Sequence, residues 1–497
     1  MQRIEQYTIK SYGFSLIVNI EGVNNRATYY NVSLPKFSVA TLALLDSVKT
    51  SIVTQVSLTS SEILDPKAIE SIKSRFVRSA SEILNKHLPN LDESTKNVLI
   101  SKLMNDMVGL GPIEYLLLDG SLEEIVVNSS REPIRVYHKR YGWLMTSIII
   151  EREEQIANYS EIIARRVGRQ ITTLDPLLDA HLITGDRANA VLYPISSKGN
   201  TITIRKFARD PWTVTDFIKN KTVTSQIFAL IWLAIQYEMN IIISGGTGSG
   251  KTSLLNVCLP FMPPNNRIIS IEDTRELQAP EFLYWAPLVT RLPNPEGKGQ
   301  ITMLDLLVNS LRMRPDRIIL GEIRRQKEAE VLFEAMHTGH SVYSTLHANS
   351  ISETISRLTN PPISVPSNLL EEVNLNLVMF RDRRNGIRRL YQLGEFLVEG
   401  EKGVVKPNIL YRWKPTTDEI VKHSDSIKFF EELNRHTGMN QNEINKDLQE
   451  KKTILDFMVK HNIRKIEEVG KIMKEFYINK DNLLKSVKKG DKRGIIK

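Results

Sequence analysis

The sequence predicts an α/β protein in which a domain with a mostly parallel sheet follows an α+β domain and precedes a helical, basic C-terminal region. Its 497 residues are too many for one hydrophobic core, and at about 150 residues per domain they indicate about three domains. From about residue 225 to 396, short apolar runs alternate with helical segments, as in βαβ units. Upstream, apolar and polar residues alternate at period two, which is typical of half-buried strands.

The composition excludes several classes of protein. A hydrophobic content of 41% and a charged content of 25% are ordinary for a soluble globular chain. The single cysteine, Cys258, excludes a disulfide framework and a CxxC zinc module, and favours a reducing compartment. The apolar run Ile227–Ile235 is too short to span a membrane, and the first thirty residues do not resemble a signal peptide. We therefore expect a cytoplasmic protein.

The net charge of +9 is concentrated at one end of the chain. Nine basic and three acidic residues lie between Lys471 and Lys497, so the last 27 residues carry +6 and the remaining 470 are nearly neutral. This basic segment is either a solvated, frayed terminus or a surface that binds anionic lipid or a membrane protein.

The predicted elements divide the chain into five regions. Gly109 to Pro112 ends a helix, and Asp210-Pro211 breaks the strand pattern before the parallel-sheet domain. Predicted helices cover 69–84, 95–108 and 151–169, and predicted strands cover 124–128, 134–137, 188–193 and 201–205. The regions are 1–95 of unknown role, an α+β domain at 96–207, a linker at 208–224, the parallel-sheet domain at 225–405 and the helical C-terminal region at 406–497.

The most specific motif is a phosphate-binding loop. It reads Gly245-Gly246-Thr247-Gly248-Ser249-Gly250-Lys251-Thr252 and matches G-x-x-x-x-G-K-[ST]. A predicted strand precedes it and a predicted helix follows, so backbone N–H groups and the positive end of the helix dipole can surround a phosphate. We expect Lys251 to contact the β- and γ-phosphates of ATP and the Thr252 hydroxyl to bind Mg²⁺. A glycine-rich turn that binds nothing is the alternative, which this context disfavours.

Two further predicted strands end in acidic residues. Strand 267–271 is followed by Glu272, and strand 317–320 by Gly321 and Glu322. In a parallel sheet the ligand lies beyond the carboxyl ends of the strands. A carboxylate there can bind Mg²⁺ or orient the attacking water. A single acid after a strand is usually a solvated residue or a helix cap, but two such acids behind a phosphate-binding loop favour a catalytic role.

Three histidines invite a comparison with metal sites. His337 and His340 precede a predicted strand at 341–346, and His347 follows it. This spacing is not a metal-binding pattern, and no H-E-x-x-H motif or cysteine pair accompanies it. The histidines are either structural or capping residues, or polar sensors that report the state of the γ-phosphate through a hydrogen bond.

Together these residues resemble the secretion-ATPase superfamily, the hexameric motors of type II and type IV secretion, type IV pili and the archaellum. Four boxes of that family occur here in the family's order. They are the P-loop (Gly245–Thr252), the aspartate box (Ser270–Leu277, with Glu272, Asp273 and Glu276), the Walker B box (Leu311–Asp316 and Ile319–Arg324, with Arg312, Gly321, Glu322 and Arg324) and the histidine box (Ala335–Ala348, with His337, His340 and His347).

The resemblance covers about residues 96–400. It implies a RecA-like ATPase domain at 225–405 behind a PAS-like domain at 96–207. The segment Val136–Gly142 is most similar to the archaeal branch of the family. The four-cysteine zinc module of the bacterial type II enzymes is absent, since the chain has one cysteine.

The resemblance also implies the partners and the mechanism. We expect a homohexameric ring that hydrolyses ATP with Mg²⁺ at the inner face of the cell membrane, together with a polytopic membrane platform protein. Glu322 is the first choice for polarising water and Glu272 the second. Because the family binds its nucleotide between the two domains, Arg187 or Arg205 could stabilise the transition-state charge. A solvated linker edge is the alternative reading of Arg205.

Two other classes of function remain open at the sequence level. Rings of RecA-like domains also move nucleic acid, and a pI of about 9.2 would suit such a translocase. The nearly neutral body and the lack of a basic groove with interleaved aromatic residues disfavour it. A scaffold that binds ATP without hydrolysing it is the third class, and the presence of both Glu272 and Glu322 disfavours it.

Overall fold

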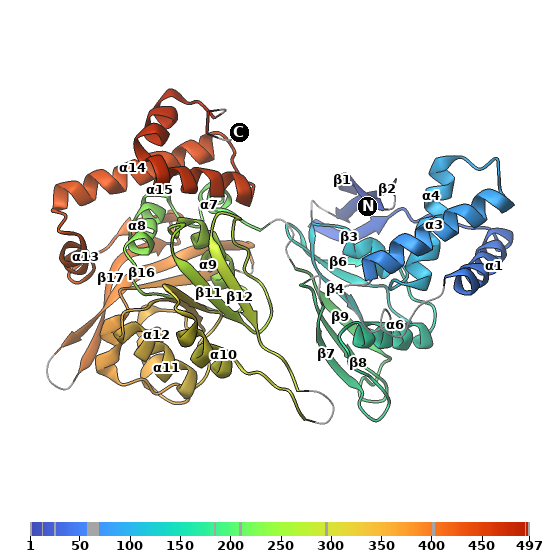
Figure 1. The fold of residues 1–497 in the computed structure, drawn as a ribbon, viewed down its shortest axis with the longest axis horizontal. Coiled ribbons are helices and arrows are strands. Elements are labelled where there is room, and N and C mark those ends of the chain that lie inside the picture. Colours follow the sequence, from blue (N-terminus) through green and yellow to red (C-terminus); the bar gives the residue numbers. More distant parts are fainter. Residues whose placement is uncertain are drawn as a thin grey trace. The chain divides into compact units, whose positions relative to one another are not determined.

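A computed structural model describes residues 2–11, 13–23, 26–56, 69–182, 185–207, 211–293, 297–382, 384–399, 403–492 and 494–495. The chain divides into two compact units, Met1–Arg209 and Asp210–Lys497. Each unit contains its own sheet and its own helices (Figure 1).

The described strands of the first unit form one nine-stranded sheet in the order β1-β2-β3-β6-β5-β4-β9-β8-β7. Neighbouring strands are antiparallel except for the parallel pair β3 and β6. The strands are β1 (Gln2–Ser11), β2 (Phe14–Val23), β3 (Arg26–Val32), β4 (Leu122–Val127), β5 (Arg135–His138), β6 (Gly142–Thr146), β7 (Leu177–His181), β8 (Arg187–Val191) and β9 (Thr201–Arg205).

The N-terminal strands, for which the sequence offered no motif, are part of this same sheet. Tyr29 of β3 pairs with Met145 of β6. The hydroxyls of Tyr7 and Tyr30 both donate to the buried carboxylate of Asp119, at 2.6 and 2.8 Å. These contacts explain why β1 to β3 extend the α+β domain instead of forming a separate one.

The first unit has two hydrophobic cores. One lies between the sheet and its covering helices, and the other joins α1, α3 and α4. The helices of this unit are α1 (Val39–Gln55), α3 (Ile69–His87), α4 (Glu93–Met107), α5 (Ile113–Leu117) and α6 (Glu153–Arg166).

The sheet of the second unit confirms the predicted α/β class. Its order is β12-β11-β13-β14-β10-β15-β16-β17-β18, with parallel pairing from β12 to β15 and antiparallel pairing from β15 to β18. The strands are β10 (Ile241–Gly245), β11 (Arg267–Glu272), β12 (Tyr284–Val289), β13 (Arg317–Leu320), β14 (Ser341–Leu346), β15 (Leu375–Asp382), β16 (Ile387–Glu399), β17 (Val404–Lys414) and β18 (Glu419–Lys422).

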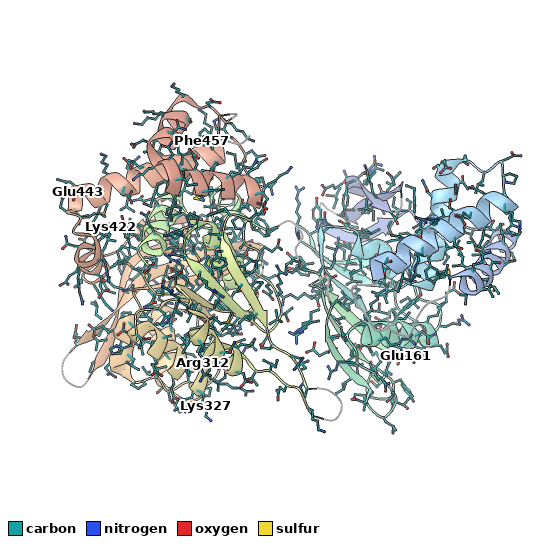
Figure 2. All side chains as sticks on the ribbon, in the orientation of Figure 1. Glu161, Arg312, Lys327, Lys422, Glu443 and Phe457 are labelled. Carbon is teal, nitrogen blue, oxygen red and sulfur yellow. The ribbon has the colours of Figure 1, made fainter. Side chains whose placement is uncertain are left out.

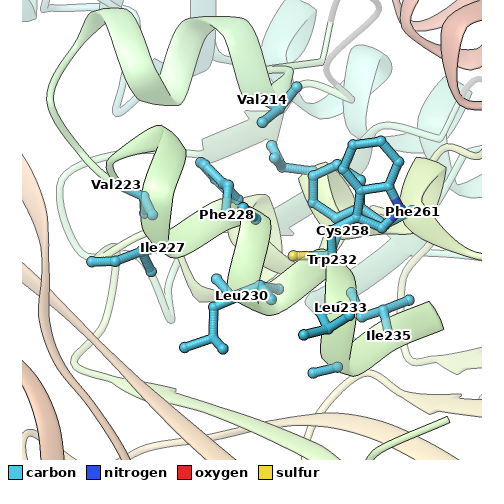
Figure 3. Close-up of a cluster of buried hydrophobic side chains, with 14 of the residues drawn as sticks. Val214, Val223, Ile227, Phe228, Leu230, Trp232, Leu233, Ile235, Cys258 and Phe261 are labelled. Atoms are coloured by element: carbon cyan, nitrogen blue, oxygen red, sulfur yellow. The ribbon is translucent and has the colours of Figure 1, made fainter. Parts of the chain in front are cut away.

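Helices cover both faces of this sheet, because successive residues of its buried strands point to opposite sides. Ile241 and Ile243 of β10 join the core under α8, α14 and α15, whereas Ile242 joins the core under α10 to α12. Figure 3 shows part of the first core, where the rings of Trp232 and Phe261 stack with centroids 5.4 Å apart. The helices are α7 (Val214–Lys219), α8 (Ser225–Gln236), α9 (Lys251–Cys258), η2 (Leu259–Phe261), α10 (Met303–Ser310), η3 (Leu311–Met313), α11 (Gln326–His337), α12 (Ile351–Thr359), η4 (Ser367–Glu372), α13 (Phe429–Thr437), α14 (Gln441–Lys460) and α15 (Ile466–Lys489).

Two region boundaries differ from the sequence expectation. The expected linker at 208–224 contains α7, whose Val214 and Phe217 join the core of the second unit. The region from 406 is not helical at first, because β17 and β18 extend the sheet before α13 begins.

The basic C-terminal segment is helical as far as Lys489. Phe476, Leu483 and Val487 of α15 are buried, so this face of the helix packs against the unit and is not a frayed end. Lys485, Lys488 and Lys489 lie on its exposed side.

Candidate functional site

The P-loop connects the buried strand β10 to α9 and folds tightly on itself. Gly245 has φ 153°, and a Cβ at this position would lie 2.5 Å from Ser249 Oγ and 2.6 Å from the Met379 carbonyl oxygen. Gly250 has φ 97°, a left-handed conformation at the start of α9. These glycines allow a curvature that turns backbone N–H groups inward, the arrangement that binds phosphate at a helix N-terminus.

Lys251 places its ammonium group inside this loop. The side chain is buried, and Nζ lies 3.2 Å from the Gly246 carbonyl oxygen and 3.3 Å from His347 Nδ1. Burial lowers the pKa of Lys251, while the nearby carboxylates of Glu322 and Glu276 oppose that shift. The ammonium is thus partly desolvated and held by neutral acceptors.

His347 links this lysine to Glu322. Its Nε2 lies 3.1 Å from Glu322 Oε1, while its Nδ1 faces Lys251. Burial and the charge of Lys251 lower the pKa of His347. We therefore assign a neutral imidazole that accepts from Lys251 at Nδ1 and donates to Glu322 from Nε2–H.

Arg324 holds the other oxygen of Glu322. Arg324 Nε donates to Glu322 Oε2 at 2.8 Å, and its Nη1 forms an ion pair with Asp273. The Thr290 hydroxyl also donates to Asp273, at 3.2 Å. We call the resulting chain of contacts the edge network, and it consists of Lys251, His347, Glu322, Arg324 and Asp273. Because these residues follow β10, β14, β13 and β11, parallel strands bring them to one edge of the sheet.

Glu272, at the end of β11, has a different environment. Its side chain is buried, and Oε1 accepts from the backbone N–H groups of Glu276 and Leu277 at 2.9 and 3.1 Å. Oε2 is buried and has no hydrogen-bond partner among the residues that the structure describes. Burial raises the pKa of Glu272 to about 7. A Cβ at Gly321 would lie 3.7 Å from Glu272 Cγ, so position 321 directly adjoins this carboxylate.

Glu272→Gln is expected to stabilise the protein without nucleotide by about 1–3 kcal/mol at pH 8. The folded carboxyl keeps its proton to about pH 7, while the unfolded one loses it near 4.5, so the cost of burying the charge grows as the pH rises through this window. The increase in free energy of unfolding of Glu272→Gln over the parent protein should therefore nearly vanish at pH 4.5. Unfolding in urea at both pH values measures it, with the exposed Glu330→Gln as control; equal gains at both pH values would contradict the assignment.

Three other residues of the boxes, His337, His340 and Arg312, lie away from this edge. His340 precedes β14, at the opposite end of the strand from His347, and its Nδ1 lies 3.2 Å from the Ala335 carbonyl oxygen at the end of α11. This contact suits a capping role for His340, and of these two histidines His347 is the one that lies at the P-loop edge. His337 pairs with Glu372 at 2.7 Å. Arg312 is exposed on η3 (Figure 2).

The two predicted catalytic arginines are neighbours in the first unit. Arg187 of β8 lies directly opposite Arg205 of β9, and both side chains are exposed. Arg187 forms a bidentate ion pair with Asp179, with distances of 3.0 and 2.6 Å. The structure thus brings the two arginines together on one face of the sheet.

Sequence reasoning missed two arginines that lie beside the P-loop. Arg388 Nε donates to the Gly248 carbonyl oxygen at 3.0 Å, and Arg381 approaches the same glycine. A signal was available, since the apolar run Leu375–Phe380 ends in Arg381 and is followed by the turn pair Asn385-Gly386.

Comparison with known proteins places the chain among secretion proteins. The family model described as "Type II/IV secretion system protein" matches residues 110–381, more than half of the chain. The "Uncharacterized protein MJ0900" of Methanocaldococcus jannaschii is 37% identical over 386 residues, which cover 76% of this chain and 69% of that protein. The "Type IV secretion system protein PtlH" of Bordetella pertussis is 30% identical over 282 residues, covering 50% of this chain and 83% of that protein.

Among solved structures, the VirB11 ATPase from the Brucella suis type IV secretion system is 22% identical and superposes with a TM-score of 0.29, covering 64% of this chain and 96% of that one. In the part of the chain that the structure describes, no helix is long and apolar enough to cross a membrane. The match of the family model across the P-loop and the boxes that follow it decides the assignment. The chain belongs to the type II/IV secretion system protein family, the secretion-ATPase superfamily that its four boxes indicated.

Proposed function

We propose that this protein is an Mg²⁺-dependent ATPase that hydrolyses ATP at the edge of the sheet in its second unit. One observation carries the proposal, namely that the P-loop ammonium of Lys251 reaches Glu322 through His347 by contacts of 3.3 and 3.1 Å. A phosphate-binding cation and a carboxylate that can orient water are thereby joined at one site. Phosphoryl transfer requires this kind of positioning more than it requires covalent chemistry.

The residues fit ATP and Mg²⁺. A bound phosphate would give the Lys251 ammonium a charged acceptor in place of the Gly246 carbonyl and the imidazole. The Thr252 hydroxyl at the start of α9 and the unpartnered Oε2 of Glu272 are oxygen donors of the kind that Mg²⁺ prefers. When bound, Mg²⁺ neutralises charge on the phosphate oxygens.

The two carboxylates suit different roles. Both oxygens of Glu322 are engaged, one by His347 and one by Arg324, so this carboxylate has a fixed orientation and can accept a hydrogen bond from the attacking water. Glu272 has a free oxygen and a pKa near neutrality, which suits a group that takes up a proton. Two carboxylates whose environments differ in this way commonly divide orienting and proton-accepting work.

His347 supports a sensing role within this cycle. Its Nδ1 faces Lys251 and its Nε2 faces Glu322, so a movement of the ammonium toward phosphate changes the hydrogen bond that orients the imidazole. The change passes to Glu322 and, through Arg324, to Asp273 after β11.

Family membership supports the wider proposal. We infer that the protein is a homohexameric motor at the cytoplasmic face of the cell membrane, where it drives a type IV pilus-like filament, an archaellum or a type II/IV secretion machine through a polytopic platform protein. One relative is named as a type IV secretion system protein, and another comes from an archaeon.

The experiment that tests this function is a phosphate-release assay on the full chain. We expect turnover with ATP and Mg²⁺, loss of turnover with EDTA, and no stimulation by single- or double-stranded DNA. Strong stimulation by DNA would instead favour the nucleic-acid translocase. Tight ATP binding without turnover would favour the scaffold.

Arg187→Ala or Arg205→Ala should bind ATP almost normally and hydrolyse it at least tenfold more slowly, if either arginine contacts the transition state. When the arginine serves a neighbouring subunit, mixing the variant with inactive Lys251→Ala protein restores part of the activity. This occurs because one mixed arrangement pairs an intact P-loop with an intact arginine. Normal turnover in both variants would remove this role, and slow variants without rescue would place the arginine in its own subunit.

The exposed lysines of α15 are proposed to attract the protein to anionic lipid. A combined Lys485→Gln, Lys488→Gln and Lys489→Gln variant should weaken salt-sensitive binding to phosphatidylserine vesicles, since each lysine contributes about 1 kcal/mol near such a surface. Basal ATPase activity should stay unchanged. Substitution is preferable to deletion, because deletion would also remove the buried Val487. Unchanged vesicle binding in co-sedimentation would exclude the lipid role.

A further inference from the structure

Two arginines from the hairpin formed by β15 and β16 pack against the glycines of the P-loop. Arg388 Nε donates to the Gly248 carbonyl oxygen at 3.0 Å. A Cβ on Gly248 would lie 2.5 Å from Arg381 Nη1, and a Cβ on Gly250 would lie 3.5 Å from Arg388 Cδ. Both arginine side chains therefore lie against the glycines of the P-loop.

The register of the hairpin places the two arginines directly opposite each other. Arg381 of β15 pairs with Arg388 of β16. Like charges at such a position repel and cost free energy. At the end of β15, Asp382 accepts from the backbone N–H of Arg384 at 2.8 Å. Two cations that face each other across paired strands are suited to an anionic ligand that lies between the two charges.

The position of the pair agrees with the location of the proposed active site. β15 is parallel to β10 and lies beside it, so Arg381 at the carboxyl end of β15 lies at the same edge as Lys251. Beyond the bond from Nε, the guanidinium group of Arg388 makes no hydrogen bond or ion pair with a residue that the structure describes. Its two amino groups are thus available to a ligand in the loop.

We propose that Arg381 and Arg388 form a subsite for the polyphosphate of a bound nucleoside triphosphate. The inference rests on the proposed function and deepens it, since it adds two cations from the same chain to Lys251. A guanidinium group stays charged throughout the working pH range and binds phosphate through two parallel hydrogen bonds. An arginine at this place also offsets the charge that develops during phosphoryl transfer.

Binding of a fluorescent ATP analogue to the full chain, with pyrophosphate as competitor, tests the subsite. Arg388→Gln and Arg381→Gln should each lower the affinity for the analogue and for pyrophosphate by about tenfold or more. Arg384→Gln, at the exposed tip of the same hairpin, is the matched control and should change affinity less than about twofold. Arg381→Gln keeps the bond between Arg388 and Gly248, so it separates phosphate binding from support of the loop. Thermal unfolding checks that each variant is folded, and Arg381→Gln carries the test if Arg388→Gln does not fold.

Several results would contradict the proposed phosphate subsite. Affinities within about twofold of the parent in both variants would remove it. A loss in Arg388→Gln alone would indicate support of the loop by the Gly248 bond. An equal loss in Arg384→Gln would indicate a diffuse electrostatic effect of the hairpin. If the parent protein binds neither probe, the proposed function fails first, and the subsite fails with it.

Discussion

Glu322→Gln is expected to retain ATP binding and to lose turnover by about 10²–10⁴, the usual contribution of one positioned acid–base group. Glutamine keeps the size of the side chain and can still accept from His347 or Arg324, but it carries no charge to polarise water. Binding should persist because Lys251 and the loop backbone, which we propose contact the phosphates, are unchanged. Steady-state phosphate release and nucleotide affinity, measured on the same preparation, separate the two effects.

Glu330→Gln is the matched control for this variant. Glu330 is exposed on α11, and among the described residues its carboxylate accepts from Gln326 at 2.8 Å, so the same change of charge should leave turnover at the parental rate. Parental turnover in Glu322→Gln would transfer the orienting role to Glu272. An equal loss of affinity and turnover would mean that Glu322 acts through Lys251 instead of through water.

Asp447→Asn is expected to destabilise the second unit by about 3–5 kcal/mol, because it leaves a buried lysine without its counter-charge. Lys451 is fully buried and forms an ion pair with Asp447. Its ammonium also lies 5.5 Å from the centroid of the Trp232 ring and 5.0 Å from that of Phe476. Lys480 approaches the other oxygen of Asp447 at 2.7 Å. The pair therefore joins α14 and α15 to α8 at the centre of the core.

The pH dependence of this variant is a second observable. Burial lowers the pKa of Lys451, so the unfolded chain binds more protons than the folded one as the pH approaches the ordinary lysine value. The loss in free energy of unfolding that Asp447→Asn causes should accordingly shrink as the pH rises from 7 to about 10. Asp456→Asn on the same helix, whose exposed pair with Lys452 spans 3.1 Å, should cost less than about 1 kcal/mol. Similar losses in both variants by urea unfolding would contradict the buried-pair account.

The local elements of the second unit were predictable because their patterns are strong. The strands expected at 317–320 and 341–346 coincide with β13 and β14, because short segments rich in β-branched and aromatic residues between helices favour strands. The candidate site followed from the same reasoning. Acids after two parallel strands must meet at one edge, and the structure places Glu272 and Glu322 after adjacent strands.

The pairing of strands that lie far apart in the chain could not be predicted from the sequence. Nothing in residues 1–95 indicated that β3 would pair with β6, because the partner strand lies more than a hundred residues away. The strand β17 was mistaken for the start of a helical region, since many of its residues are polar and exposed and its buried positions are few. Arg381 and Arg388 were missed for the same reason, because their approach to Gly248 depends on β15 pairing with β10.

Phosphate release by the parent protein and by Lys251→Ala, measured side by side in ATP and Mg²⁺, tests the central claim most directly. The account predicts turnover by the parent and none above background in the variant, because alanine removes the cation that binds the phosphates and the partner that orients His347. Equal phosphate release by the two proteins would show that hydrolysis does not occur at the P-loop edge and would contradict the account.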